Sequence, residues 1–212
     1  MARRIDNKRR ISNDRVGRIR RSKSKIIIAV EGNNKTEKLY FNNFDNGKKS
    51  YSITIAKGNN TDPVGLVKSL SKEIERIGLD FLEGDRAYCI FDTDTDIIKN
   101  KAINDARKYA NTKGIIIITS TPSIELWFLL HYEYTTASLS NNEVIKRLRN
   151  HYSKYEKNVN IFPYINDKVD KAIENAKRLE KYQFSNNKKI GMVEANPNTE
   201  IYKIVEYLNK LD

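Results

Sequence analysis

Four short apolar runs that alternate with amphipathic segments constrain the fold of this chain more than any other feature. The runs are rich in β-branched residues and cover residues 25–30, 51–56, 86–91 and 114–119. Apolar residues recur at helical spacing between them, over 36–44, 64–77 and 99–112. Strands alternating with helices favour a mostly parallel sheet with helices on both faces. Continuous apolar runs are typical of strands buried on both sides.

The remainder of the chain indicates mainly helices. Residues 122–132 are apolar nearly all round, which predicts a buried helix. A capping box formed by Ser140 and Glu143 predicts the start of another helix. Further helices are expected over 167–182 and from Asn196–Thr199 onwards. We therefore expect an α/β domain over 25–135, followed by a mainly helical C-terminal subdomain over 136–212.

The positive charge of the chain is concentrated at its N-terminus. The net charge is +12, and residues 1–25 hold eleven Lys and Arg against two Asp, so 11 − 2 = +9 lies there. Such a segment favours sequence-independent contact with nucleic-acid phosphates, and a solvated tail is the alternative. We expect residues 1–24 to form a basic, flexible arm. The candidate nucleic-acid-binding residues of the arm are Arg9, Arg10, Arg18, Arg20 and Arg21.

Composition excludes several classes of protein. The chain has no run of 18 apolar residues, which argues against a membrane-spanning helix. Its basic N-terminus lacks the apolar segment of a secretory signal, so we expect a cytoplasmic protein. One cysteine and two histidines exclude an intramolecular disulfide framework and make a histidine-based or cysteine-rich metal site improbable. A bound metal would have to be a hard cation held by carboxylates.

Acidic residues follow two of the predicted strands at the point where each strand ends. Glu31 follows the first strand, and Asp92, Asp94 and Asp96 follow the third. The carboxyl ends of parallel strands share one edge of a sheet, where ligands gather. Carboxylates crowded there repel one another unless a cation neutralises them, and all-oxygen ligands suit Mg²⁺ or Mn²⁺. The alternative is that these aspartates only cap a helix.

Two loop motifs that these residues resemble fail on particular positions. An EF-hand loop opening at Asp92 needs Gly at its sixth position and Glu at its twelfth, and the chain has Ile97 and Ile103 there. A phosphate-binding P-loop ending at Lys35-Thr36 would need glycine at positions 29 and 34, which are Ala29 and Asn34. Neither a calcium loop nor a P-loop is therefore expected.

The order and spacing of four segments resemble the RloB-like family of Toprim proteins over residues 25–210. The matching segments are Val30-Glu31-Gly32-x-x-x-Thr36-Glu37-x-x-Tyr40-Phe41, Phe91-Asp92-x-Asp94, Pro122-Ser123-Ile124-Glu125-Leu126-Trp127-Phe128-Leu129-Leu130-His131 and Asn196-Pro197-x-Thr199. The resemblance implies a Toprim-like fold in which Glu31 acts as general acid or base or assists metal binding. It also implies that Asp92 and Asp94 bind the metal. The basic arm is a departure, because it is longer than the family pattern requires.

Several further residues have a functional and a structural interpretation. Asp96 is a candidate for a water-mediated metal contact, and Glu125 for a further metal ligand with a catalytic role; a first-turn helix glutamate is the alternative for Glu125. His131 is a candidate proton shuttle or a buried structural histidine. Lys35 either meets a phosphate or is a plain surface lysine. A last group of residues either stacks an unpaired base or packs an irregular segment, and it comprises Tyr152, Tyr155, Phe162 and Tyr164, with Lys154 and Lys157.

These features together predict a divalent-metal-dependent nuclease that uses Mg²⁺ or Mn²⁺ and prefers RNA, including tRNA, over DNA. The family resemblance implies a role in antiphage defence, with an ATPase, restriction or CRISPR component as a possible partner. One alternative is a nucleotide- or nucleic-acid-sensing module with a degenerate Toprim site. Another is a nucleotidyl transferase or small-nucleotide hydrolase, since the same metal chemistry serves those reactions.

Overall fold

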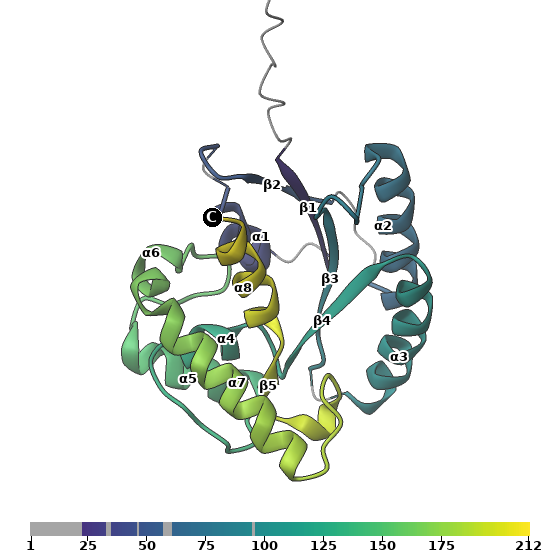
Figure 1. The fold of residues 1–212 in the computed structure, drawn as a ribbon. Coiled ribbons are helices and arrows are strands. Elements are labelled where there is room, and N and C mark those ends of the chain that lie inside the picture. Colours follow the sequence, from purple (N-terminus) through teal and green to yellow (C-terminus); the bar gives the residue numbers. More distant parts are fainter. Residues whose placement is uncertain (1–22, 33–34, 46, 57–60, 95) are drawn as a thin grey trace, which may run out of the picture.

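The computed structural model of the protein describes residues 23–32, 35–45, 47–56, 61–94 and 96–212. Its centre is one five-stranded sheet (Figure 1). The strands are β1 (Ser24–Val30), β2 (Tyr51–Ile55), β3 (Arg86–Asp92), β4 (Ile115–Thr121) and β5 (Asn198–Thr199). Their spatial order is β2-β1-β3-β4-β5. The first four are parallel to one another, which confirms the predicted mostly parallel α/β fold.

The fifth strand differs from the prediction. The sequence indicated that a helix begins around Asn196–Thr199, whereas Asn198 and Thr199 form β5 and pair antiparallel with Thr121 and Ser120 of β4. The last helix starts only at Ile201. A two-residue strand is too short for any alternation of apolar and polar residues, so its pairing depends on contacts distant in the sequence.

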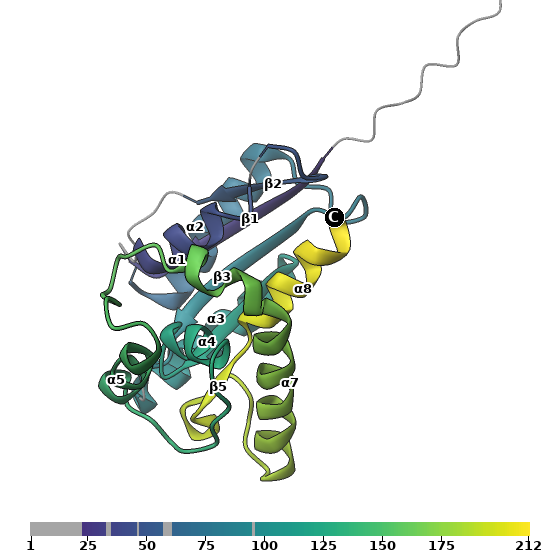
Figure 2. The same cartoon turned by 90° about the vertical axis from the view of Figure 1, so that its left-hand side faces the viewer.

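Helices cover both faces of the sheet, as Figures 1 and 2 show. They are α1 (Lys35–Asn42), α2 (Pro63–Ile77), α3 (Ile97–Thr112), α4 (Glu125–Leu130), α5 (Asn141–His151), α6 (Phe162–Ile165), α7 (Val169–Ser185) and α8 (Ile201–Leu211). On one face, α2 and α3 pack with Ile27, Cys89 and Ile117 of the strands. Because Cys89 is fully buried among apolar side chains, burial raises the pKa of its thiol, as expected of a core cysteine.

The opposite face of the sheet carries a larger hydrophobic cluster. It joins Ile28 of β1 and Ile90 of β3 to Trp127 of α4, Leu179 of α7 and Ile204 of α8. The C-terminal part of the chain therefore shares the core of the α/β part and also supplies β5 to its sheet. No helix within the described residues is long and apolar enough to cross a membrane.

Local sequence signals explain where several helices begin and end. The Asp62 side chain accepts a hydrogen bond from the Gly65 backbone N–H, and Pro63 occupies the first helical position of α2. Gly78 ends α2 with a φ of 66°, a left-handed conformation that favours glycine. At α5 the predicted capping box forms, because Ser140 and Glu143 each satisfy a backbone N–H of the other.

Candidate active site

The carboxyl ends of β1 and β3 bring the two predicted acidic segments to the same edge of the sheet. In the parallel ladder Val30 lies opposite Ile90, so Glu31 and Asp92 leave neighbouring strands one residue apart in register. Neighbouring strands are separated by only about 4.8 Å. This register places Glu31 near the aspartates at the end of β3, as the sequence analysis expected.

Asp92, the last residue of β3, sits in an environment that disfavours a lone negative charge. Its Oδ1 is buried and has no hydrogen-bond partner among the described residues. Burial is the main cause that raises the pKa of Asp92 well above its ordinary value, and the carboxylates of Glu37, Glu125 and Asp94 add to it. The nearby Lys99 ammonium opposes this rise. A positive charge placed beside Oδ1 would relieve the repulsion.

Glu125 occupies the first turn of the short helix α4, directly after β4. It is almost completely buried, with an exposed fraction of 2 %, and its charge acts on Asp92. The Ser123 hydroxyl donates to Oε2 at 2.6 Å and the Tyr155 hydroxyl donates to Oε1 at 3.1 Å. Both oxygens of the Glu125 carboxylate are thus already held by hydroxyl groups, which fixes its orientation beside Asp92.

Tyr155 belongs to the aromatic group for which base stacking was considered. Its ring is fully buried and packs inside the protein, and its hydroxyl donates a hydrogen bond to Glu125. Burial, with the charges of Glu125, Glu37 and Asp92, raises the pKa of its hydroxyl, so the hydroxyl remains a donor. Elsewhere in this group, Phe162 packs on Tyr40 and Phe44. Tyr152 and Tyr164 stack on each other at 4.5 Å between ring centroids. Packing accounts for all of these contacts.

Glu37 joins the carboxylate group, although a first-turn glutamate ordinarily only complements the positive end of its helix. It does lie in the first turn of α1, yet it is buried, with an exposed fraction of 3 %, and its charge raises the pKa of Asp92. The only sequence signal was its place in the segment Thr36-Glu37, which resembles the family pattern. Spacing alone did not predict that α1 turns this side chain toward β3.

A lysine that the sequence analysis did not consider joins Glu31 to Asp94. The Lys99 Nζ lies 2.8 Å from Glu31 Oε2 and 2.8 Å from Asp94 Oδ2. Partial burial disfavours its charge, but hydrogen bonds to Asp94 and Glu31 raise the pKa of Lys99 overall. One ammonium group therefore bridges carboxylates that come from two different strand ends.

The two remaining aspartates have different roles, because Asp94 lies in the candidate site and Asp96 caps a helix. Asp94 adopts a left-handed backbone with a φ of 51°, and its Oδ1 accepts a hydrogen bond from the Asn141 side chain at 3.0 Å. Asp96 is the N-cap of α3, because its side chain accepts from the Ile98 N–H at 2.8 Å. For Asp96 the structure thus provides the capping interaction that was the alternative to a metal contact.

Other predicted residues are not brought to the carboxylates. His131 is fully buried and bonds through Nδ1 to the Trp127 carbonyl at 2.9 Å, and its ring contacts the edge of the Trp127 indole. This arrangement matches the structural interpretation of the histidine. Lys35 is exposed at the first residue of α1. The arm residues, from Arg9 to Arg21, lie outside the described part of the chain.

Comparison with known proteins assigns the chain to a family. The family described as RloB-like protein matches residues 26–208. The chain belongs to the RloB-like family. This confirms the family that the sequence resembled. The matched range spans the carboxyl-edge residues from Glu31 to Glu125 and leaves out the basic arm. No curated protein and no solved structure matches this RloB-like chain.

The candidate ligand atoms of this RloB-like protein are of the chemical type that a hard divalent cation prefers. All the candidate ligands offer carboxylate oxygens, and Asp92 Oδ1 is a buried acceptor to which no described residue donates. As the side chains stand, the described residues contain no group of three His, Cys, Asp or Glu that could hold a metal ion. The ammonium of Lys99 takes the position between Glu31 and Asp94. Metal binding would therefore require Lys99 to move.

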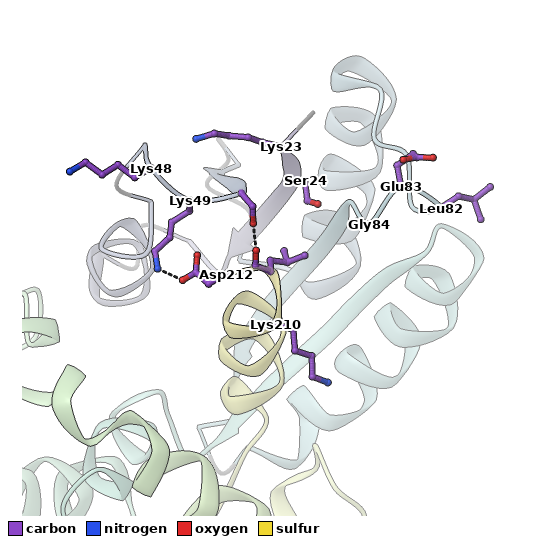
Figure 3. Close-up of a pocket in the computed structure, with 11 residues that line it drawn as sticks. Lys23, Ser24, Lys48, Lys49, Leu82, Glu83, Gly84, Lys210 and Asp212 are labelled. Atoms are coloured by element: carbon purple, nitrogen blue, oxygen red, sulfur yellow. Dashed lines mark hydrogen bonds and ion pairs between the residues drawn. The ribbon is translucent and has the colours of Figure 1, made fainter. Parts of the chain in front are cut away.

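A cavity lies at the other end of the sheet. It has a volume of about 1210 Å³ and is lined by residues at the amino ends of β1 and β3, the segment before β2 and the end of α8. Figure 3 shows that Lys48 and Lys210 point in different directions, and that Lys49 turns toward Asp212. Because these lysines do not converge on one point, we do not assign this cavity to an anionic ligand.

Proposed function

We propose that this RloB-like protein is a divalent-metal-dependent nuclease of Toprim type that cleaves phosphodiester bonds, with RNA preferred over DNA. The observation that supports this most directly is the Asp92 carboxylate, whose buried Oδ1 has no hydrogen-bond partner in the described part of the chain and lies near further carboxylates. Most buried side-chain oxygens in folded proteins have a hydrogen-bond donor. A carboxylate with one buried, unpartnered oxygen among other carboxylates is instead suited to a cation that arrives from solution.

Asp92, Asp94 and Glu31 would hold Mg²⁺ or Mn²⁺ at this edge. When bound, such an ion polarises a phosphodiester and stabilises the charge on the oxygen that leaves. Glu125 keeps the charge density beside Asp92 high, because Ser123 and Tyr155 fix its carboxylate there. Glu31 is our candidate to accept or donate a proton, since the ion pair that its carboxylate makes among the described residues is with the flexible side chain of a lysine.

The test is cleavage of total cellular RNA, single-stranded DNA, duplex DNA and nucleoside triphosphates in separate reactions. We expect RNA cleavage with Mn²⁺ or Mg²⁺ that stops on addition of EDTA. Asp92→Asn and Glu31→Gln should each lower the rate at least about 100-fold. Asp105→Asn is the matched control, because Asp105 is an exposed residue of α3 whose ion pair is with the exposed Lys108. Full activity of the Asp92 or Glu31 variant would contradict the assignment.

A second candidate is a nucleic-acid-sensing module whose carboxylates no longer bind a metal. The Lys99 ammonium between Glu31 and Asp94 favours it, because an internal cation can neutralise the site permanently. Two measurements distinguish this module from the nuclease. The module should bind RNA with the same affinity whether or not Mn²⁺ is present, and calorimetry should detect no Mn²⁺ binding.

A further inference from the structure

Lys99 stands where an ordinary helix would not place a positive charge. It is the third residue of α3, which begins at Ile97, so it lies in the first turn. The N-terminus of a helix carries partial positive charge, which disfavours a cation there. The side chain is also largely shielded, with an exposed fraction of 14 %. Its two ion pairs at 2.8 Å, to Glu31 and to Asp94, supply the compensation.

The two carboxylates that hold Lys99 are also the proposed metal ligands that flank Asp92. Lysine has a flexible stem and a compact charge, so its ammonium can exchange one oxygen partner for another without rearranging the backbone. A divalent cation that takes the same two carboxylates excludes the ammonium by charge repulsion and by competition for the oxygens. Anionic phosphate oxygens would be the natural alternative partners for a displaced ammonium in a nuclease site.

We infer that Lys99 is an exchangeable internal counter-ion: it pairs Glu31 with Asp94 in the metal-free protein and turns to a substrate phosphate when a divalent cation is bound. This inference rests on the proposed nuclease function. It makes Lys99 a positioning residue that links metal binding to nucleic-acid binding. Since such coupling is reciprocal, each ligand strengthens the binding of the other.

The first test measures Mn²⁺ affinity by calorimetry in the absence of nucleic acid. Lys99→Gln removes the competing charge and should bind Mn²⁺ about tenfold more tightly than the unchanged protein. Lys99→Arg should bind it more weakly, because a guanidinium holds carboxylates through several donors. Lys101→Gln is the matched control, an exposed lysine of the same helix, and its affinity should stay within about twofold. Circular dichroism checks that each variant is folded.

The second test measures the affinity for a fluorescent phosphorothioate RNA, whose linkages resist hydrolysis. Mn²⁺ should raise RNA affinity in the unchanged protein and in Lys101→Gln, and several-fold less in Lys99→Gln. Equal and measurable Mn²⁺ affinity in the Lys99→Gln variant and the unchanged protein would overturn this inference and leave the nuclease proposal standing. Absence of Mn²⁺ binding in both would overturn the proposed function, and this inference with it.

Discussion

At the scale of single residues, Asp92 lowers the stability of the fold that presents it. A folded-state pKa above the ordinary value means that the folded protein holds this proton more tightly than the unfolded chain does. Ionisation above the ordinary pKa therefore destabilises the fold at neutral pH. Asp92→Asn should raise the melting temperature at pH 7.5 by about 2–4 °C, which corresponds to about 1 kcal/mol.

The same Asp92 comparison separates a ligand from a structural residue. Added Mn²⁺ should raise the melting temperature of the unchanged protein and have little effect on Asp92→Asn, because binding to the folded state stabilises it. Asp105→Asn serves again as the surface control. A lower melting temperature for Asp92→Asn without metal would mean that Asp92 makes a stabilising contact, and would count against its role as an unsatisfied ligand.

His131 gives a prediction about pH. Its Nδ1–H donates to the Trp127 carbonyl, and Nε2 is buried without a partner among the described residues, so the fold holds the neutral ring. Burial lowers the pKa of His131 from 6.5 to about 4. As the pH falls from about 6.5 to about 4, the histidine is protonated in the unfolded chain but stays neutral in the folded protein. The free energy of unfolding therefore decreases over that pH range. The loss reaches about 2 kcal/mol at pH 5.

Urea unfolding at pH 7.5 and pH 5 tests this. His131→Gln should show a smaller loss of unfolding free energy between the two pH values, by about 2 kcal/mol. His151→Gln is the matched control, because His151 is an exposed residue beside Glu133. An unchanged pH dependence in the His131 variant would show that other groups, the buried carboxylates among them, cause the acid sensitivity.

At the scale of elements, the sequence predicts what is local. The strands from β1 to β4 and the helices between them carry their own apolar periodicity, so their order follows from the chain alone. β5 and Lys99 could not be predicted in this way. A strand of two residues is too short to show an alternation of apolar and polar residues. The role of Lys99 depends on its ion pair with Glu31, which is far away in the sequence. Glu31, Asp92 and Asp94 could be predicted because each follows a recognisable strand.

Glu200 shows how one buried residue ties three elements together. Its Oε2 accepts from the Thr119 hydroxyl of β4 at 2.7 Å and pairs with Arg107 of α3 at 3.2 Å. Its Oε1 pairs with Lys203 of α8 at 2.8 Å. Burial opposes ionisation, yet the charges of Lys203 and Arg107 hold the pKa of Glu200 below its usual range. The stability it supplies is therefore present at neutral pH and is lost as the pH falls through that lowered pKa.

Glu200→Ala should lower the free energy of unfolding at pH 7 by about 2–3 kcal/mol, because Arg107 loses this ion pair and the Thr119 hydroxyl loses its acceptor, whereas Lys203 keeps Glu180. Urea denaturation measures this directly. Asp105→Ala breaks the exposed pair with Lys108 on α3 and should cost at most about 0.5 kcal/mol. Comparable losses in the two variants would mean that the Glu200 contacts do not hold α3, β4 and α8 together.

At the scale of the whole molecule, the basic arm precedes β1 in the sequence, whereas the carboxylates follow the opposite end of that strand. β1 begins at Ser24 and ends at Val30, where Glu31 follows (Figure 1). At about 3.3 Å per residue, this strand separates the start of the described chain from the site by roughly 20 Å. A chain as long as residues 1–22 can span at most about 70–80 Å. The arm is thus long enough to contact a nucleic acid both near the site and far from it, and we expect these contacts to add affinity while the carboxylate residues determine the rate of cleavage.

This separation predicts that affinity and turnover can be changed independently. Replacing Arg9, Arg10, Arg18, Arg20 and Arg21 by Gln keeps the length of the arm and removes five charges. The KM for RNA should rise, and the slope of log affinity against log salt should fall by at most about 3–4. The kcat should stay within about twofold, because Glu31 and Asp92 are unaltered. Glu31→Gln should do the reverse, lowering kcat while RNA affinity persists. If the five-Gln variant binds RNA unchanged at low and high salt, the arm is a solvated tail and the substrate is held by the folded domain alone.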